Sequence, residues 1–215
     1  DWIDKLERRW GRYGIPNLIN ILLAGQLITG IIALVFNAGV LFDLLLFRDA
    51  VLHGRIWQLI TFLFYPTWIG GFLGILNLFF YFWLGNALTR YWGDFRMTLF
   101  IALGMVGCWL GAFLMGVGTS GAIFQSLVFA YAWLWPDQGV LLFGIIPFKM
   151  KYLGWLELAY WLWSFLRAGS LGARRSLVLG LAAFLVFFGR EDVDWCKETA
   201  TGYKRRRDWE NRNRR

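Results

Sequence analysis

The dominant pattern along the chain is a series of long apolar runs, separated by short segments that contain charged residues, Gly or Pro. The runs reach about twenty residues, the length at which a helix crosses the hydrocarbon core of a bilayer. The polar residues within the first run, such as Asn17 and Gln26, are neutral. The pattern predicts six transmembrane helices, at residues 16–36, 68–88, 97–115, 119–135, 152–166 and 176–188.

The connection between the first two predicted helices, residues 37–66, has a different pattern. It is rich in Leu and Phe, and its ionisable residues are Asp43, Arg48, Asp49, His53 and Arg55. Charges among apolar residues suit a segment that lies in the membrane interface better than one that crosses the core. We expect a large membrane-embedded first loop that contains a short amphipathic helix.

The two ends of the chain are more polar than the middle. Residues 1–15 are charged and lack the apolar core of a signal peptide. Residues 190–215 mix basic and acidic residues without apolar periodicity. The sequence therefore predicts an N-terminal segment over 1–15, an all-α membrane domain over 16–189 and a basic tail over 190–215.

Composition supports a membrane protein and narrows its chemistry. Of the 215 residues, 58% are hydrophobic, 20% aromatic and 17% charged, whereas a soluble domain carries more charge. Glu157 is the main ionisable residue within the predicted spans, and an ion pathway needs several such groups around a cavity. A transporter or channel is therefore not expected.

Neither a cofactor nor a metal is predicted. Cys108 lies in an apolar run and Cys196 in the polar tail, so the two cysteines suggest neither a disulfide framework nor a metal site. The sequence contains no phosphate-binding loop and no cluster of metal ligands. Nucleic acid is a poor partner for a tail attached to a membrane.

The distribution of Lys and Arg predicts the orientation. If both termini lie on one side, that side carries 17 of the 22 basic residues, and the other carries Arg48, Arg55, Arg167, Arg174 and Arg175. Cytoplasmic flanks collect Lys and Arg, so we expect both termini in the cytoplasm. The basic flanks suit a bacterial inner membrane, and a protein of an organelle membrane would look similar.

Several motifs carry a family resemblance. Gly118-Thr119-Ser120-Gly121 opens the fourth predicted helix, and Asn77 lies in the second. Residues 56–64 are similar to a Trp-Arg-Leu-Leu-Thr stretch that ends a first loop, with Gln58 in place of the arginine. Together with six helices and an embedded first loop, these motifs resemble the rhomboid family of intramembrane serine proteases.

The resemblance implies Ser120 as a nucleophile and Asn77 as an oxyanion-hole residue, but the family's proton acceptor is missing. Rhomboids carry a catalytic histidine in the sixth helix, ahead of a small-x-x-x-small pattern that Ser176 and Gly180 reproduce here. The corresponding position is Ala173 or Leu177, and neither can take a proton. Because a serine without a base is a poor nucleophile, the departure implies a pseudoprotease, in the company of the derlins.

The alternative is an active rhomboid-type protease in which Ser120 uses a non-standard base. His53 is the one histidine in the chain and lies in the first loop. Lys149 and Lys151 could form a Ser-Lys pair, but the charge distribution places them on the opposite face of the membrane from Ser120. A histidine at an interface is more often simply solvated.

Packing offers an explanation of the vestigial motif that needs no chemistry. Gly118, Ser120 and Gly121 would let the fourth helix approach the face of the sixth that carries Ser176 and Gly180, as small residues do between membrane helices. The Ser120 hydroxyl could also cap free amides at the helix start. A buried asparagine such as Asn77 commonly bridges two helices through hydrogen bonds.

The tail suggests contacts outside the bilayer. Its most basic run is Lys204, Arg205, Arg206 and Arg207, and its aromatic residues include Trp195 and Trp209. Such a segment can bind anionic lipid or an acidic partner. Binding without cleavage follows from the resemblance: we expect a scaffold or accessory subunit of a larger membrane complex, or a protein that binds transmembrane clients.

Overall fold

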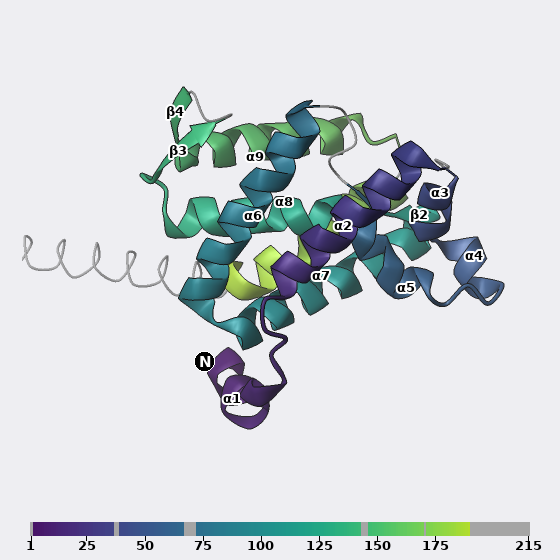
Figure 1. Ribbon diagram of the computed structural model, residues 1–215, viewed down its shortest axis with the longest axis horizontal. Coiled ribbons are helices and arrows are strands. Elements are labelled where there is room, and N and C mark those ends of the chain that lie inside the picture. The colour runs from purple at the N-terminus through teal and green to yellow at the C-terminus, as the bar shows by residue number, and fades with distance from the viewer. Residues whose placement is uncertain (1, 37–38, 67–71, 143–145, 170, 190–215) are drawn as a thin grey trace, which may run out of the picture.

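Helices make up most of the chain (Figure 1). The computed structural model describes residues 2–36, 39–66, 72–142, 146–169 and 171–189. The longer helices are α1 (Trp2–Trp10), α2 (Leu18–Val35), α6 (Phe72–Trp92), α7 (Asp94–Met115), α8 (Gly121–Leu134), α9 (Met150–Arg167) and α10 (Leu171–Gly180). After a turn at Leu181, residues 182–189 are again helical.

A helix occupies each of the six segments in which the apolar runs predict a span, with shifted ends. The helix α7 begins at Asp94, directly after Gly93, whose φ of +83° ends the preceding helix. The helix α10 begins at Leu171, ahead of the apolar run. Its first turns can contain Arg174 and Arg175 because both side chains are exposed. Among the described helices, α2 and α7 are long and apolar enough to cross a membrane, whereas the apolar α8 has only 14 residues.

The predicted first loop contains several short elements instead of one amphipathic helix. They are α3 (Val40–Leu44), β1 (Leu46–Phe47), α4 (Arg48–Leu52), α5 (Gln58–Thr61) and the 3₁₀ turn η2 (Phe62–Phe64). The strand β1 pairs antiparallel with β2 (Val117–Gly118), with Leu46 opposite Gly118. This pairing fixes the loop against the chain that enters α8.

A β-hairpin joins α8 to α9, where the sequence suggested only a link between helices. The strands β3 (Gly139–Leu142) and β4 (Ile146–Lys149) are antiparallel, with Gly139 opposite Lys149. At its base, the Asp137 carboxylate lies 3.1 Å from the Lys151 ammonium and 3.6 Å from that of Lys149. The two short sheets are the described departures from an all-α fold.

The helix α8 lies at the centre of the bundle (Figure 1). Four consecutive residues of α8 each contact a different helix, because successive side chains point about 100° apart. The contacts are Ile123 with Gly104 in α7, Phe124 with Tyr81 in α6, Gln125 with Glu157 in α9, and Ser126 with Gly180 in α10. Phe124 and Ser126 are almost completely buried.

Contacts between helix termini define two opposite ends of the helical bundle. At one, the N-terminal end, Arg96 of α7 pairs with Glu7 of α1 at 2.8 Å, and the Asn20 and Asn86 amides exchange hydrogen bonds of 3.1 and 2.8 Å. At the other, the loop end, the first loop packs against the end of α7 and the start of α8. Long helices that follow one another along the chain thus alternate in direction.

Glycines lie at the closest helix contacts. A methyl group added at Gly107 of α7 would collide with the Leu179 carbonyl oxygen of α10, and one at Gly180 would lie 2.8 Å from the Ala122 methyl group of α8. Backbones that approach this closely are typical of helices that associate in membranes. The outer surface is apolar as well, with Ile28 in α2 and Trp155 in α9 exposed by 58% and 69%.

Candidate functional site

Ser120 is the residue that directly precedes α8, and it is completely buried. Its hydroxyl makes no capping hydrogen bond to the helix, so the capping role that the sequence suggested is wrong. The hydroxyl instead donates to the backbone carbonyl of Tyr65, 3.5 Å away, at the end of the first loop. A peptide carbonyl cannot accept the serine proton as a general base, so this contact positions the hydroxyl without activating it.

The carbonyl of Tyr65 is one of four near the end of the first loop that accept hydrogen bonds from side chains of the long helices. The donors are Trp109 Nε1 to Leu59 at 2.9 Å, Gln26 Nε2 to Leu63 at 2.9 Å, Thr29 Oγ1 to Phe64 at 2.6 Å, and Ser120 Oγ to Tyr65. The last carbonyls of a helix have no partner within it. In a bilayer such groups need partners from the protein itself, so these donors hold the loop in place.

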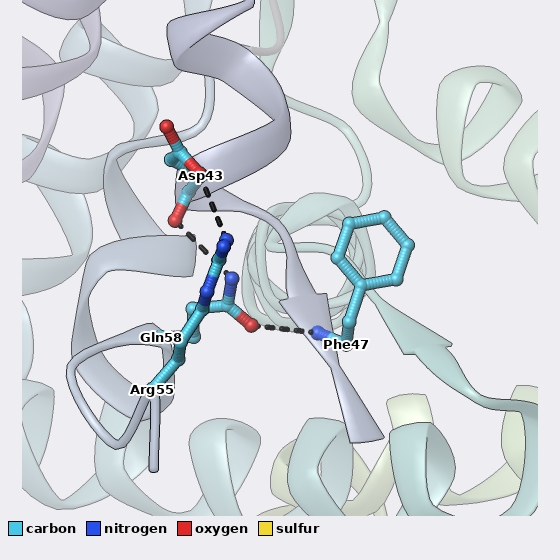
Figure 2. Close-up of polar contacts among 4 residues, drawn as sticks. All are labelled: Asp43, Phe47, Arg55 and Gln58. Carbon is cyan, nitrogen blue, oxygen red and sulfur yellow. Dashed lines mark hydrogen bonds and ion pairs between the residues drawn. The ribbon is translucent and has the colours of Figure 1, made fainter. Parts of the chain in front are cut away.

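The first half of the loop is held by Gln58, which is also completely buried. Figure 2 shows its amide between two backbone groups: Oε1 accepts from the Phe47 N–H at 3.1 Å, and Nε2 donates to the Asp43 carbonyl at 3.4 Å. Arg55 and the Asp43 carboxylate form an exposed ion pair of 3.0 Å beside it. Gln58, which the resemblance aligns with an arginine of rhomboids, thus joins α5 to α3 and to β1.

His53 follows α4, and its ring is exposed. Its Nδ1 lies 2.6 Å from the Asp49 carbonyl oxygen, within its own loop. No hydrogen bond joins His53 to Ser120 in the described part of the chain. Lys151 lies beyond the far end of α8, whose 14 residues extend about 21 Å from Ser120. Among the described contacts, none of the three candidate bases, His53, Lys149 and Lys151, forms a hydrogen bond with Ser120.

Asn77 lies in α6 and is partly buried. The ring of Tyr81 lies 4.9 Å from that of Phe124, and farther along both helices Tyr91 lies 5.0 Å from Trp135. The helices α6 and α8 therefore run in the same direction. Asn77 lies four residues before Tyr81, and Ser120 lies four residues before Phe124. Both are therefore at the loop end of the bundle. No hydrogen bond joins them among the described contacts.

The small residues of the motif have different surroundings. Gly118 is tightly enclosed, because an added methyl group would lie 3.0 Å from the Ala112 methyl group and 3.2 Å from Leu46. At Gly121 the nearest such contact is Thr119 Oγ1, at 3.7 Å. Gly180 faces Ala122 rather than the motif itself. Ser176 lies within α10, and its side chain is outside the described part.

The predicted contact residues of the tail, Lys204 to Arg207 with Trp195 and Trp209, lie outside the described residues. Within the described part, no three His, Cys, Asp or Glu side chains are grouped to hold a metal ion. The groups that the sequence interpretation missed are the loop anchors Gln58, Thr29 and Trp109. Their only sequence signal is a hydrogen-bonding group within an apolar run.

No protein-family model, curated protein or solved structure matches this chain. The rhomboid resemblance therefore depends on the sequence motifs alone.

Proposed function

We propose that this chain is an integral membrane protein with an inactive rhomboid-type fold, and that it binds transmembrane helices of other proteins without cleaving them. The observation that carries the proposal is the Ser120 hydroxyl, which is buried and donates to the Tyr65 backbone carbonyl. A positioned general base contributes about a hundredfold to ten-thousandfold in rate. Without one, the nucleophile position of the family keeps a structural role only.

The apolar outer surface supports insertion of all six helical segments. In α9 alone, Trp155, Leu156, Tyr160 and Leu166 are each exposed by about two thirds. An apolar surface of this extent marks a membrane or protein contact. Spans two to six would then be α6, α7, α8, α9 and α10 with residues 182–189.

The charges at the two ends support an orientation with the N-terminus in the cytoplasm. The N-terminal end carries Lys5, Arg8, Arg9, Arg12, Arg90, Arg96, Lys149 and Lys151. The loop end carries five basic residues, Arg48, Arg55, Arg167, Arg174 and Arg175. Of these, Arg48 and Arg55 are paired with Asp49 and Asp43, which reduces the net charge there. This asymmetry follows the positive-inside rule.

Labelling with a fluorophosphonate probe tests the absence of catalysis. We expect no labelling that depends on Ser120, in detergent and in lipid, while an active rhomboid protease labels under the same conditions. Labelling of the wild type that disappears in Ser120→Ala would make the chain an active protease with a non-standard base. Thermal unfolding of Ser120→Ala shows that the variant is folded.

Extraction in mild detergent tests the binding function. We expect the protein in particles well above its own 25.0 kDa, together with defined membrane-protein chains in constant ratio. A particle that contains this chain alone, from native membranes and in several detergents, would contradict a role as a subunit or as a binder of stable clients.

A further inference from the structure

Glu157 is a carboxylate in the middle of an otherwise apolar helix surface. It lies roughly 10 Å along α9 from Met150 and roughly 15 Å from Arg167. It is partly buried, whereas Trp155, Leu156 and Leu158 around it are exposed. If α9 spans the bilayer as proposed above, this carboxylate lies well inside the hydrocarbon core.

The surroundings of Glu157 supply one neutral hydrogen bond. Gln125 Nε2 of α8 donates to Glu157 Oε2 at 2.9 Å, and Tyr81 of α6 lies within electrostatic range of the carboxylate. On α9 itself, the Trp161 indole donates to the Leu177 carbonyl at 3.3 Å and not to Glu157. No described Lys, Arg or His forms an ion pair with Glu157.

A carboxylate with one amide donor is incompletely satisfied. Its two oxygens can accept about four hydrogen bonds, and an ionised group inside a membrane is costly unless it is paired. Polar residues at such depth are functional by default and pair with an opposite charge. Among the described residues no cation pairs with Glu157, so its carboxylate is available to a cation that another molecule brings.

We infer that Glu157 is an anchoring site for a partner transmembrane helix that carries a Lys or Arg residue within its apolar span. The inference rests on the proposed binding function and specifies the chemistry of the partner. A Lys or Arg side chain is long enough to reach a partly buried carboxylate while its helix packs along the exposed apolar face of α9. Charge complementarity selects this partner over lipid, because a neutral acyl chain offers no counter-charge.

Designed peptides test the inference directly. The probe is a fluorescent transmembrane peptide of about twenty Leu and Ala residues with one central Lys, and the reference peptides carry Leu or Asp at that position. Energy transfer to the labelled protein in phosphatidylcholine nanodiscs measures binding. We expect the Lys peptide to bind about tenfold more tightly than the Leu peptide, and Glu157→Gln to abolish this preference.

A charge swap and a matched control make the test specific. Glu157→Lys is expected to prefer the Asp peptide, which a misfolded variant could not do. Glu7→Gln makes the same chemical change at the N-terminal end, where Glu7 pairs with Arg96, and is expected to keep the preference for Lys.

The outcomes separate the two proposals. Equal binding of the Lys and Leu peptides to the wild type, or a Lys preference that survives in Glu157→Gln, would overturn the anchoring role and leave transmembrane binding in place. Absence of binding by every peptide would overturn the anchoring role, and the native particle mass then decides the binding function independently.

Discussion

Replacing Gln58 by Leu should release the first loop from the helical bundle. Gln58 is completely buried, and its amide joins the Phe47 N–H to the Asp43 carbonyl. Leu has a similar volume but no polar atoms, so the substitution removes the hydrogen-bond partner of the partly buried Phe47 N–H and of the Asp43 carbonyl. The packing stays nearly the same, and the measured change therefore reports the hydrogen bonds.

The expected magnitude follows from these two groups. A buried backbone group left without a partner costs about 1–3 kcal/mol. The bond to Phe47, at 3.1 Å, has good length, whereas that to Asp43, at 3.4 Å, is near the limit of a hydrogen bond. Because Asp43 is exposed, most of the cost comes from the Phe47 N–H, and we expect Gln58→Leu to lower the free energy of unfolding by roughly 1–3 kcal/mol. Arg55→Gln, which removes the exposed ion pair, should cost less than about 1 kcal/mol.

Unfolding by denaturant in detergent micelles measures the free energy, and hydrogen exchange locates the change. Gln138→Leu is the matched control, because Gln138 is exposed in the turn before β3, and it should stay within about 0.5 kcal/mol of the wild type. Exchange should accelerate in residues 43–58 of the Gln58 variant before it does in α7. Equal stability of the two Leu variants, or unchanged exchange in the loop, would refute the anchoring role of Gln58.

Three further predictions concern helix contacts and surface charge. Gly107→Val should lower the free energy of unfolding by about 1–3 kcal/mol in denaturant unfolding, because its side chain meets the α10 backbone. Gly121→Ala should be neutral or slightly stabilising, because its methyl group makes only an ordinary contact with Thr119 Oγ1 at 3.7 Å. Equal effects of the two substitutions would contradict the packing. A double-mutant cycle of Asn20→Leu and Asn86→Leu should give a coupling of about 0.6–1.7 kcal/mol, and strict additivity would mean that their two hydrogen bonds contribute nothing. The hydrogen bond from Lys151, followed by the charges of Lys151 and Lys149, lowers the pKa of Asp137 below 3.8, so its contribution to stability is present above that pH and is lost as the pH falls through the lowered pKa. Carboxyl NMR should show a smaller lowering of the Asp137 pKa in Lys151→Gln, with Lys149 still present. An unchanged titration of Asp137 would contradict the pairing.

The positions of the helices could be predicted because apolar length determines them. The run from Met97 to Met115 predicted α7 to within three residues, and residues 152–166 predicted α9 to within two residues at its start. The end at Gly116, with a φ of +89°, is one that only Gly adopts easily. The start of α10 was missed because Arg174 and Arg175 interrupt the apolar pattern without interrupting the helix.

The details of the site could not be predicted because they depend on contacts distant in sequence. Ser120 and Tyr65 are separated by 55 positions, and Gln26 and Leu63 by 37. A sequence shows that Gln26 is polar within an apolar run, but not which backbone carbonyl it reaches. The hairpin of β3 and β4 was missed for a related reason, because its apolar strands resemble the ends of the neighbouring helices.

Polar side chains in and beside the apolar helices supply hydrogen bonds to the first loop. A loop of short helices and strands inside a bilayer exposes backbone carbonyls that lipid cannot satisfy. Gln26, Thr29 and Ser120 each donate to one of those carbonyls from a different position in the bundle. Among the described contacts Ser120 thus helps to hold the first loop, whereas the Glu157 carboxylate accepts a hydrogen bond from the Gln125 side chain and contacts no backbone group.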